Sequence, residues 1–350
     1  MKRKLFRIGG ILLACIVFLG ALYAASRLVA PKYHDDLVEG HLTGEYYDEK
    51  TDHDVLFVGD CEVFENFSPV TLYNEYGITS YIRGGAQQLV WHSYYLLEDA
   101  LKTETPRVVV FNVLALKYGA PQSEAYNRLN LDGMRWGAAK LGAIKASMTE
   151  GEDLMSYVFP LLRYHDRITG LTREDVRYWF SKGEPVSFKG YLMHAGVKPN
   201  RGLPTPPILK DGEKHLPESS MEWLGRMAAL CKERGIALVL IKSPSIDPYW
   251  YPEWSADVEA FAKSHGLLYT DMIERNDAIG IDMQTDTYDE GAHLNVFGAE
   301  KAARWLGERL QREYALPDHR GEAEYDTDYA ALTARYEAEK QRQISEENGK

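Results

Sequence analysis

Short, continuous apolar runs alternate with helix-like segments along most of this chain. The first run, DVLFVGD at residues 54–60, is apolar enough for a strand that is buried on both faces. Comparable runs predict further strands at residues 78–85, 107–113, 236–244 and 267–272. The segments between them have apolar residues at helical spacing, which is typical of crossovers between parallel strands. The sequence therefore predicts an α/β fold with a mostly parallel sheet that helices cover on both faces.

One long segment interrupts this alternation. Residues from about 115 to 215 are predicted to form a helical insertion over the open edge or the mouth of the sheet. In an open parallel sheet ligands bind outside the carboxyl ends of the strands, so an insertion there can shape a substrate site. The α/β domain is expected to span residues 53–316. A polar tail, residues 317–350, is predicted to be a loosely held helix or disordered.

The N-terminus has the pattern of a membrane anchor. Four basic residues precede an uninterrupted run of low polarity, residues 8–25, whose length fits a membrane-spanning helix. The positive-inside rule then places the N-terminus in the cytoplasm. We predict an uncleaved, single-pass anchor over residues 1–27, a polar connector over residues 28–52 and an extracytoplasmic domain at the cell membrane. Two alternatives stay open: small residues at 24–26 permit a cleaved signal peptide, and LLAC at 12–15 is similar to a lipoprotein cleavage site.

Charge and cysteine content exclude several classes of function. The formal net charge is -12 and no basic stripe is present, which argues against a nucleic-acid partner. The 3 cysteines form no disulfide framework, and Cys231 is expected in the core. Since no His, Asp and Glu set has metal-ligand spacing, we predict no metal and no other cofactor.

Two stretches contain residue types suited to nucleophilic catalysis. The first strand ends in the motif GDC, where Cys61 is either a nucleophile or a small buried thiol. The stretch TYDEGAHLN places Asp289 and Glu290 four and three positions before His293, in a turn that precedes a predicted helix. A carboxylate that orients one ring nitrogen of an imidazole allows the other to act as a base. The spacing does not decide between the two carboxylates.

These stretches resemble the sequence blocks of the SGNH/GDSL hydrolase superfamily, in particular its membrane-anchored, extracytoplasmic members in Gram-positive bacteria. DVLFVGDC resembles the first block, with Cys61 in the place of the nucleophilic serine. YIRGGAQQ stands in the place of the second block, and VVVFNV puts Asn112 where the third block supplies an asparagine. DEGAHLN resembles the final block, which carries the acid and the histidine. The blocks follow in the family's order from about residue 50 to 315.

The resemblance implies a flavodoxin-like three-layer sandwich and an esterase or O-acyltransferase that acts on acyl esters, such as acylated glycans of the cell envelope. In this mechanism Cys61 attacks the carbonyl, His293 moves the proton, and Asp289 or Glu290 orients the imidazole. The resemblance also implies a set of oxyanion donors: the backbone amides of Cys61, Gly84 and Gly85 and the side-chain amide of Asn112.

A structural role is the alternative for each of these residues. Asn112 could satisfy backbone groups at a strand end, and the glycines could form an ordinary turn. The corresponding alternative function is a noncatalytic module with the same fold, which binds a glycan or assists a membrane acyltransferase.

Other aromatic and histidine residues have weaker signals. His92 and His165 lie in helical apolar patterns and are expected to pack in a core or an interface. The aromatic residues of SPSIDPYWYPEW, residues 243–254, follow the fourth predicted strand. They could stack on sugar rings, although a packed loop is the commoner meaning.

Overall fold

The computed structural model of the protein describes residues 2–32, 40–181, 184–202 and 205–349. The chain divides into two compact units. Unit 1 consists of Met1–Val38 and Met148–Glu184, and unit 2 consists of Glu39–Ser147 and Pro185–Lys350.

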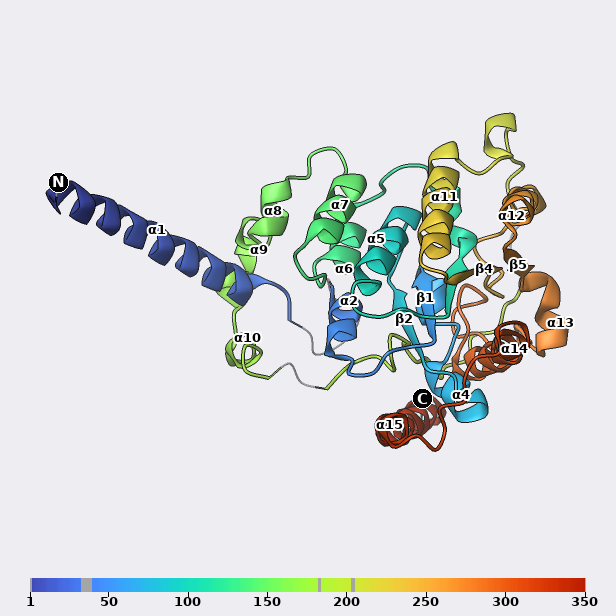
Figure 1. The fold of residues 1–350 in the computed structure, drawn as a ribbon. Helices are drawn as coiled ribbons and strands as arrows, with labels where there is room; N and C mark the ends of the chain where they lie inside the picture. Colours follow the sequence, from blue (N-terminus) through green and yellow to red (C-terminus); the bar gives the residue numbers. More distant parts are fainter. Residues whose placement is uncertain (1, 33–39, 182–183, 203–204, 350) are drawn as a thin grey trace. The chain divides into compact units, whose positions relative to one another are not determined.

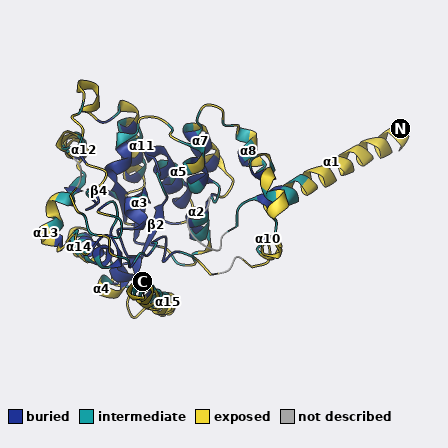
Figure 2. Ribbon diagram, turned by 180° about the vertical axis from the view of Figure 1, so that it is seen from behind, coloured by how far each residue is buried: buried dark blue, intermediate teal, exposed yellow. Residues whose placement is uncertain are grey.

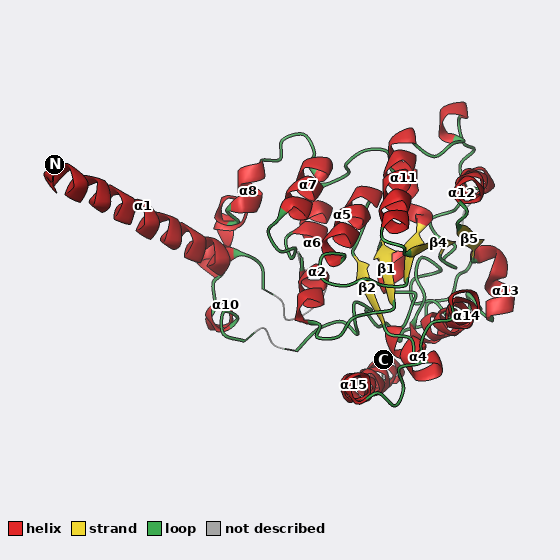
Figure 3. Cartoon of the chain, viewed as in Figure 1, coloured by secondary structure: helices red, strands yellow, loops and turns green. Residues whose placement is uncertain are grey.

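A five-stranded, all-parallel sheet forms the centre of unit 2 (Figures 1 and 3). Its strands are β1 (Val55–Gly59), β2 (Ser80–Gly84), β3 (Val108–Asn112), β4 (Ala237–Lys242) and β5 (Leu268–Asp271). Their order is β2-β1-β3-β4-β5, which is a doubly wound arrangement. Each strand lies where an apolar run predicted one, so the prediction of an α/β fold with a mostly parallel sheet is confirmed.

Helices cover both faces of the sheet because successive side chains of each strand point to opposite, buried sides. Val55 and Phe57 of β1 belong to one apolar cluster, and Leu56 and Val58 belong to the other. The first face carries α4 (Pro69–Tyr76) and α14 (Val296–Tyr314), and the second carries α5 (Val90–Ala100), α11 (Glu218–Glu233) and α12 (Pro252–His265). Figure 1 shows these helices on either side of the sheet, which is consistent with a three-layer α/β fold.

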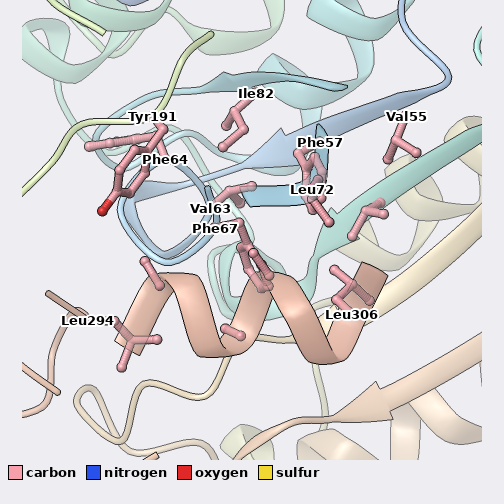
Figure 4. Packing of buried hydrophobic residues seen from close by; sticks show 14 of the residues in the cluster. Val55, Phe57, Val63, Phe64, Phe67, Leu72, Ile82, Tyr191, Leu294 and Leu306 are labelled. Carbon is pink, nitrogen blue, oxygen red and sulfur yellow. The ribbon is translucent and has the colours of Figure 1, made fainter. Parts of the chain in front are cut away.

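The segment that follows β1 packs into the apolar cluster that contains Val55 and Phe57. The short helix α3 (Cys61–Phe64) and the residues after it bury three side chains completely: Val63, Phe64 and Phe67. Figure 4 shows Phe67 against α14 and Phe64 near Tyr191, and the Phe67 ring stacks on Phe57 at a centroid distance of 5.4 Å. Truncating a core Phe to Ala typically costs about 3–5 kcal/mol. The packing therefore fixes the position of Cys61, which begins α3.

The predicted insertion is divided between the two units. Unit 2 contains η2 (Val113–Lys117), α6 (Glu124–Leu131), α7 (Ala138–Ser147) and η4 (Asp211–Glu213). Of these, α7 packs against α5. Residues 185–202 also belong to unit 2, where the Lys189 carbonyl accepts a hydrogen bond from Ile82 of β2. The same segment reaches the turn before α14, because the Lys198 amide donates to the Thr287 carbonyl at 3.0 Å. Residues 182–183 and 203–204 of the insertion lie outside the described residues.

Unit 1 combines the N-terminal helix with the middle of the insertion. Its helices are α1 (Lys2–Val29), α8 (Leu154–Val158), α9 (Leu161–Tyr164), η3 (His165–Gly170) and α10 (Arg173–Arg177), and α1 contacts α9, η3 and α10. Arg3–Val29 form a helix that is long and apolar enough to cross a membrane, and its 18-residue apolar window has a mean hydropathy of 2.4. Most of α1 is exposed (Figure 2). A signal sequence passes the same test, so the helix by itself is weak evidence of anchoring. The side chain of His165 is 63% exposed and does not pack in a core, unlike that of His92.

The connector and the tail both contribute to unit 2. Residues 33–39 of the connector lie outside the described residues, but α2 (His41–Glu45) and η1 (Tyr46–Asp48) bury Leu42 and Tyr46. The tail forms α15 (Ala323–Asn348), and the Tyr329 ring stacks on Tyr73 at a centroid distance of 3.7 Å. Tyr336 is buried as well. The tail is thus a packed helix, not the loosely held segment that its polarity predicts. Two short helices complete the unit: η5 (Ile273–Arg275) and α13 (Asn276–Ile279).

Candidate active site

Cys61 is the first residue of α3, directly after β1. Gly59 has φ 153, and a Cβ on it would lie 2.4 Å from Val63 Cγ2, so only glycine allows this sharp strand-to-helix turn. Asp60 caps the helix, because its carboxylate accepts a hydrogen bond from the Glu62 amide at 3.2 Å. The GDC motif thus turns Cys61 out of the sheet at the carboxyl end of β1.

The turn before α14 holds His293 through Asp289. One carboxylate oxygen of Asp289 accepts from the His293 amide at 2.7 Å, and the other lies 2.6 Å from the ring nitrogen Nδ1. The Thr287 hydroxyl donates to the His293 carbonyl at 2.8 Å. Asn295 caps α14 through the Phe297 and Gly298 amides. With Nδ1 engaged by Asp289, the second ring nitrogen, Nε2, is the one available for proton transfer.

The Cys61 thiol and the His293 imidazole are close enough that each shifts the pKa of the other. Cys61, His293 and Asp289 therefore form one cluster. Glu290 is not part of it: its backbone has φ 68, and its carboxylate lies 3.3 Å from the Lys198 ammonium. Of the two carboxylates that the spacing left open, Asp289 is the one that contacts the imidazole.

A second carboxylate, Glu65, faces the same imidazole. Glu65 Oε2 lies 3.4 Å from His293 Nδ1 and accepts a hydrogen bond from the Tyr288 hydroxyl. Burial raises the pKa of Glu65 to about 7. Nothing in the sequence signals this role, because Glu65 and His293 are far apart in the chain.

The electrostatic environment disfavours a preformed thiolate. Burial raises the pKa of the Cys61 thiol to about 11, against the opposing effect of His293. Burial lowers the pKa of His293, but the hydrogen bond to Asp289 and the charge of Glu65 outweigh it and raise the pKa well above its ordinary value. Because both pKa values are raised, the favoured state at neutral pH is a neutral Cys61 thiol beside a protonated His293 imidazole. The pair must therefore lose one proton before Cys61 can attack.

The Asn112 side chain is fully hydrogen-bonded within the fold. Its NH₂ group donates to Asp60 Oδ1 at 2.9 Å and to Glu62 Oε2 at 3.0 Å, and its oxygen accepts from the Ser243 amide at 2.9 Å. The residue is completely buried. Since both amide hydrogens are committed, the predicted role of Asn112 as an oxyanion donor does not fit this geometry; Asn112 instead joins the ends of neighbouring strands.

The two predicted glycines are also held within the fold. Gly84 ends β2 in register with Gly59, and the Gly85 amide donates to the Gly59 carbonyl at 3.3 Å. The Gly85 amide is thus not free to bind an oxyanion. In the part of the chain that the structure describes, no hydrogen bond is found for the backbone amide of Cys61. Among the Cys61, Gly85 and Asn112 amides, the Cys61 amide is thus the one that stays available.

A buried ion pair lies beneath the candidate nucleophile. The Lys242 ammonium, at the end of β4, is 2.9 Å from both carboxylate oxygens of Glu62. It also donates to the carbonyls of Ser243 and Ser245, at 2.9 and 3.0 Å. Both charged side chains are almost completely buried. The pair therefore ties α3 to the β4 end.

Asn66 connects three segments of the site. Its NH₂ group donates to the hydroxyls of Ser243 and Ser245, at 2.7 Å each, and its oxygen accepts from the Leu294 amide at 2.7 Å. The segment after β1, the β4 end and the His293 turn are thus held by one buried side chain. The sequence analysis missed both Asn66 and Lys242.

Comparison with known proteins gives no further assignment. No family model matches the sequence, and no curated protein matches it at a significant level. Across the described ranges, no group of three or more His, Cys, Asp and Glu side chains is placed to hold a metal ion. The chemistry of the site is therefore interpreted from its own geometry.

Proposed function

We propose that the protein is a hydrolase or acyltransferase of the SGNH/GDSL type, with Cys61 as its nucleophile. The observation that carries this proposal is the cluster at the carboxyl edge of a parallel sheet, in which Asp289 lies 2.6 Å from the His293 imidazole and Cys61 lies close enough to that imidazole to shift its pKa. Ligands of open parallel sheets bind at this edge. The resemblance of the four sequence blocks to that superfamily supports the same conclusion.

The reaction follows from the roles of these three residues. His293 Nε2 takes the Cys61 proton as the sulfur bonds to the acyl carbon, and the carbonyl electrons move to the oxygen. The Cys61 amide is placed to stabilise this oxyanion. The C–O bond then breaks, and the leaving alcohol takes the proton from His293. Water or an acceptor alcohol, deprotonated by His293, attacks the thioester and releases the Cys61 thiol.

The location and the substrate are part of the same proposal. The apolar helix α1, with basic residues at its start, supports a single-pass anchor with unit 2 outside the membrane. An extracytoplasmic active site would meet acyl esters of cell-envelope glycans. A membrane acyltransferase that loads Cys61 is a fitting partner, because a thioester can pass its acyl group to an alcohol.

A noncatalytic, glycan-binding or accessory module is the second candidate. The Asn112 and Gly85 amides already donate hydrogen bonds within the fold, so fewer donors are left to stabilise an oxyanion. This observation favours the noncatalytic module. The raised pKa of Cys61 points the same way.

An assay of the full chain in detergent separates the two candidates. With p-nitrophenyl acetate as substrate, we expect turnover by the wild type and at least about a hundredfold loss in Cys61→Ala and His293→Ala. His215→Ala is a matched control, because His215 also pairs with a carboxylate, Asp257, at 3.0 Å but lies outside the site. The enzyme hypothesis is refuted if the wild type shows no turnover and if His293→Ala does not change the rate of Cys61 alkylation. The noncatalytic module would then be the remaining candidate.

A further inference from the structure

A cavity of about 700 Å³ lies at the β5 edge of the sheet. It is lined by the loop after β4, the first half of α12, the end of β5, η5, one residue of α14, and Thr205 and Pro206. Its size is within the range of about 300–1,000 Å³ that is typical of small-molecule sites. Neither Cys61 nor His293 is among its lining residues.

Three aromatic side chains contribute to the wall of the cavity: Tyr249, Trp250 and Tyr269. Tyr249 is 42% exposed, although a tyrosine of a packed loop would be buried. Its ring makes an edge-to-face contact with Tyr251, at a centroid distance of 4.9 Å. A rigid, partly exposed ring in a concave wall offers a stacking surface for a flat, weakly polar ligand face.

Charged groups of both signs surround the same space. Glu259, Glu274, Arg275 and Arg309 line the cavity, and no ion pair is found for any of them within the described residues. A purely anionic ligand would be repelled by the glutamates, and a purely cationic one by the arginines. Hydroxyl groups both donate and accept, so a polyhydroxylated ligand can use both kinds of side chain. Stacking aromatics combined with both carboxylates and guanidiniums favour a saccharide.

The cavity is connected to the candidate active site through one loop. Ile246 lines the cavity, and its amide donates to the Gly291 carbonyl in the His293 turn at 2.9 Å. Ser243 and Ser245, at the start of the same loop, contact Asn66. A ligand in the cavity would therefore lie beside the His293 turn.

We propose that this cavity binds a saccharide of two or three rings, stacked on Tyr249. The inference does not depend on the chemistry of Cys61. It assigns a function to the aromatic loop after β4, which the active-site contacts leave unexplained.

Calorimetric titration of the full chain, in a detergent without a sugar head group, tests this proposal. The probes are maltotriose, cellotriose and chitotriose. We expect saturable binding of at least one, weakened about tenfold or more by Tyr249→Ala, which corresponds to the loss of one stacked aromatic contact. Tyr249→Phe keeps the ring and should bind like the wild type. Trp136→Ala, which removes an aromatic residue that is 53% exposed elsewhere in unit 2, is the matched control.

The outcomes separate this proposal from the proposed function. Binding that survives Cys61→Ala, in a variant without turnover, supports the cavity as an independent saccharide site. The proposal is overturned if none of the three saccharides binds, or if Tyr249→Ala binds them as the wild type does. Ester turnover without saccharide binding would support the hydrolase and refute the saccharide site.

Discussion

Replacing Glu65 with Gln tests the electrostatics of the candidate site most directly. The Gln side chain has the same shape and can still accept the Tyr288 hydroxyl, so the substitution removes charge and leaves the packing in place. Glu65 raises the pKa of His293 and also that of Cys61. Removing its charge should therefore lower both pKa values. The Cys61 and His293 pair should then lose its first proton at a lower pH.

The structure gives the magnitude of this effect. At the 3.4 Å between Glu65 Oε2 and His293 Nδ1, two unit charges interact by about 5 kcal/mol at an effective dielectric constant of about 20. The pKa of Glu65 is raised only to about 7, whereas that of the Cys61 thiol is raised to about 11 and that of His293 well above its ordinary value, so Glu65 is charged where the pair titrates. The full interaction of about 5 kcal/mol then applies, which corresponds to a pKa lower by about 3 to 4.

The pH dependence of Cys61 alkylation by iodoacetamide measures this shift without requiring turnover. Mass spectrometry of the Cys61 peptide separates it from Cys15 and Cys231. The midpoint reports the pair and not either residue alone. We expect it to fall by about 3 to 4 pH units in Glu65→Gln, and the acid limb of kcat/KM to move with it. Glu75→Gln, which removes a surface carboxylate that pairs with Arg304, should change neither. An unchanged or higher midpoint in Glu65→Gln would show that Glu65 does not control the imidazole.

Two further substitutions test other parts of the site. Asp289→Asn should lower kcat/KM by about a hundredfold or more, because the imidazole loses its orienting carboxylate, whereas Glu290→Gln should stay near the wild-type value; equal losses would contradict the assignment of the acid. Lys242→Met should lower the free energy of unfolding in urea by about 3–5 kcal/mol, because it leaves the Glu62 carboxylate buried without its partner, and adding Glu62→Gln should recover part of the loss. No recovery in the double variant would show that the loss comes from packing.

The positions of the strands could be predicted because their signal is local. Each of the five apolar runs is short, bounded by turn residues and separated from the next by a helix, so parallel pairing is the arrangement that buries both faces. The helix α15 was harder to predict. It buries only Tyr329 and Tyr336 among many charged residues, so its average polarity conceals the two positions that hold it on the protein.

The candidate site could be predicted only where chemistry follows sequence motifs. GDC and DEGAHLN each combine a reactive side chain with the turn that presents it, and the structure places both motifs in one site. Lys242, Glu62 and Asn66 act through contacts between segments that are distant in sequence, so no spacing reveals them. For Asn112, in contrast, the sequence predicted a role that the geometry does not fit. Its position at the end of β3 suggested a substrate contact, but the neighbouring polar groups of Asp60 and Glu62 consume its hydrogen bonds.

The environment of Cys61 also bears on how a cysteine could act in the place where SGNH/GDSL hydrolases, the family proposed for this protein, use serine. Reactive cysteines gain their advantage from positive surroundings that lower the thiol pKa. Here burial raises it most, the carboxylates of Asp60 and Glu65 raise it further, and the Lys242 ammonium is already bound by Glu62. Attack must then depend on proton transfer to His293 during the reaction, which is the way a serine hydroxyl is activated. Cys61→Ser should therefore keep kcat/KM for an ester within about tenfold of the wild type. A loss as large as that of Cys61→Ala would instead mean that a thiolate forms before substrate binds.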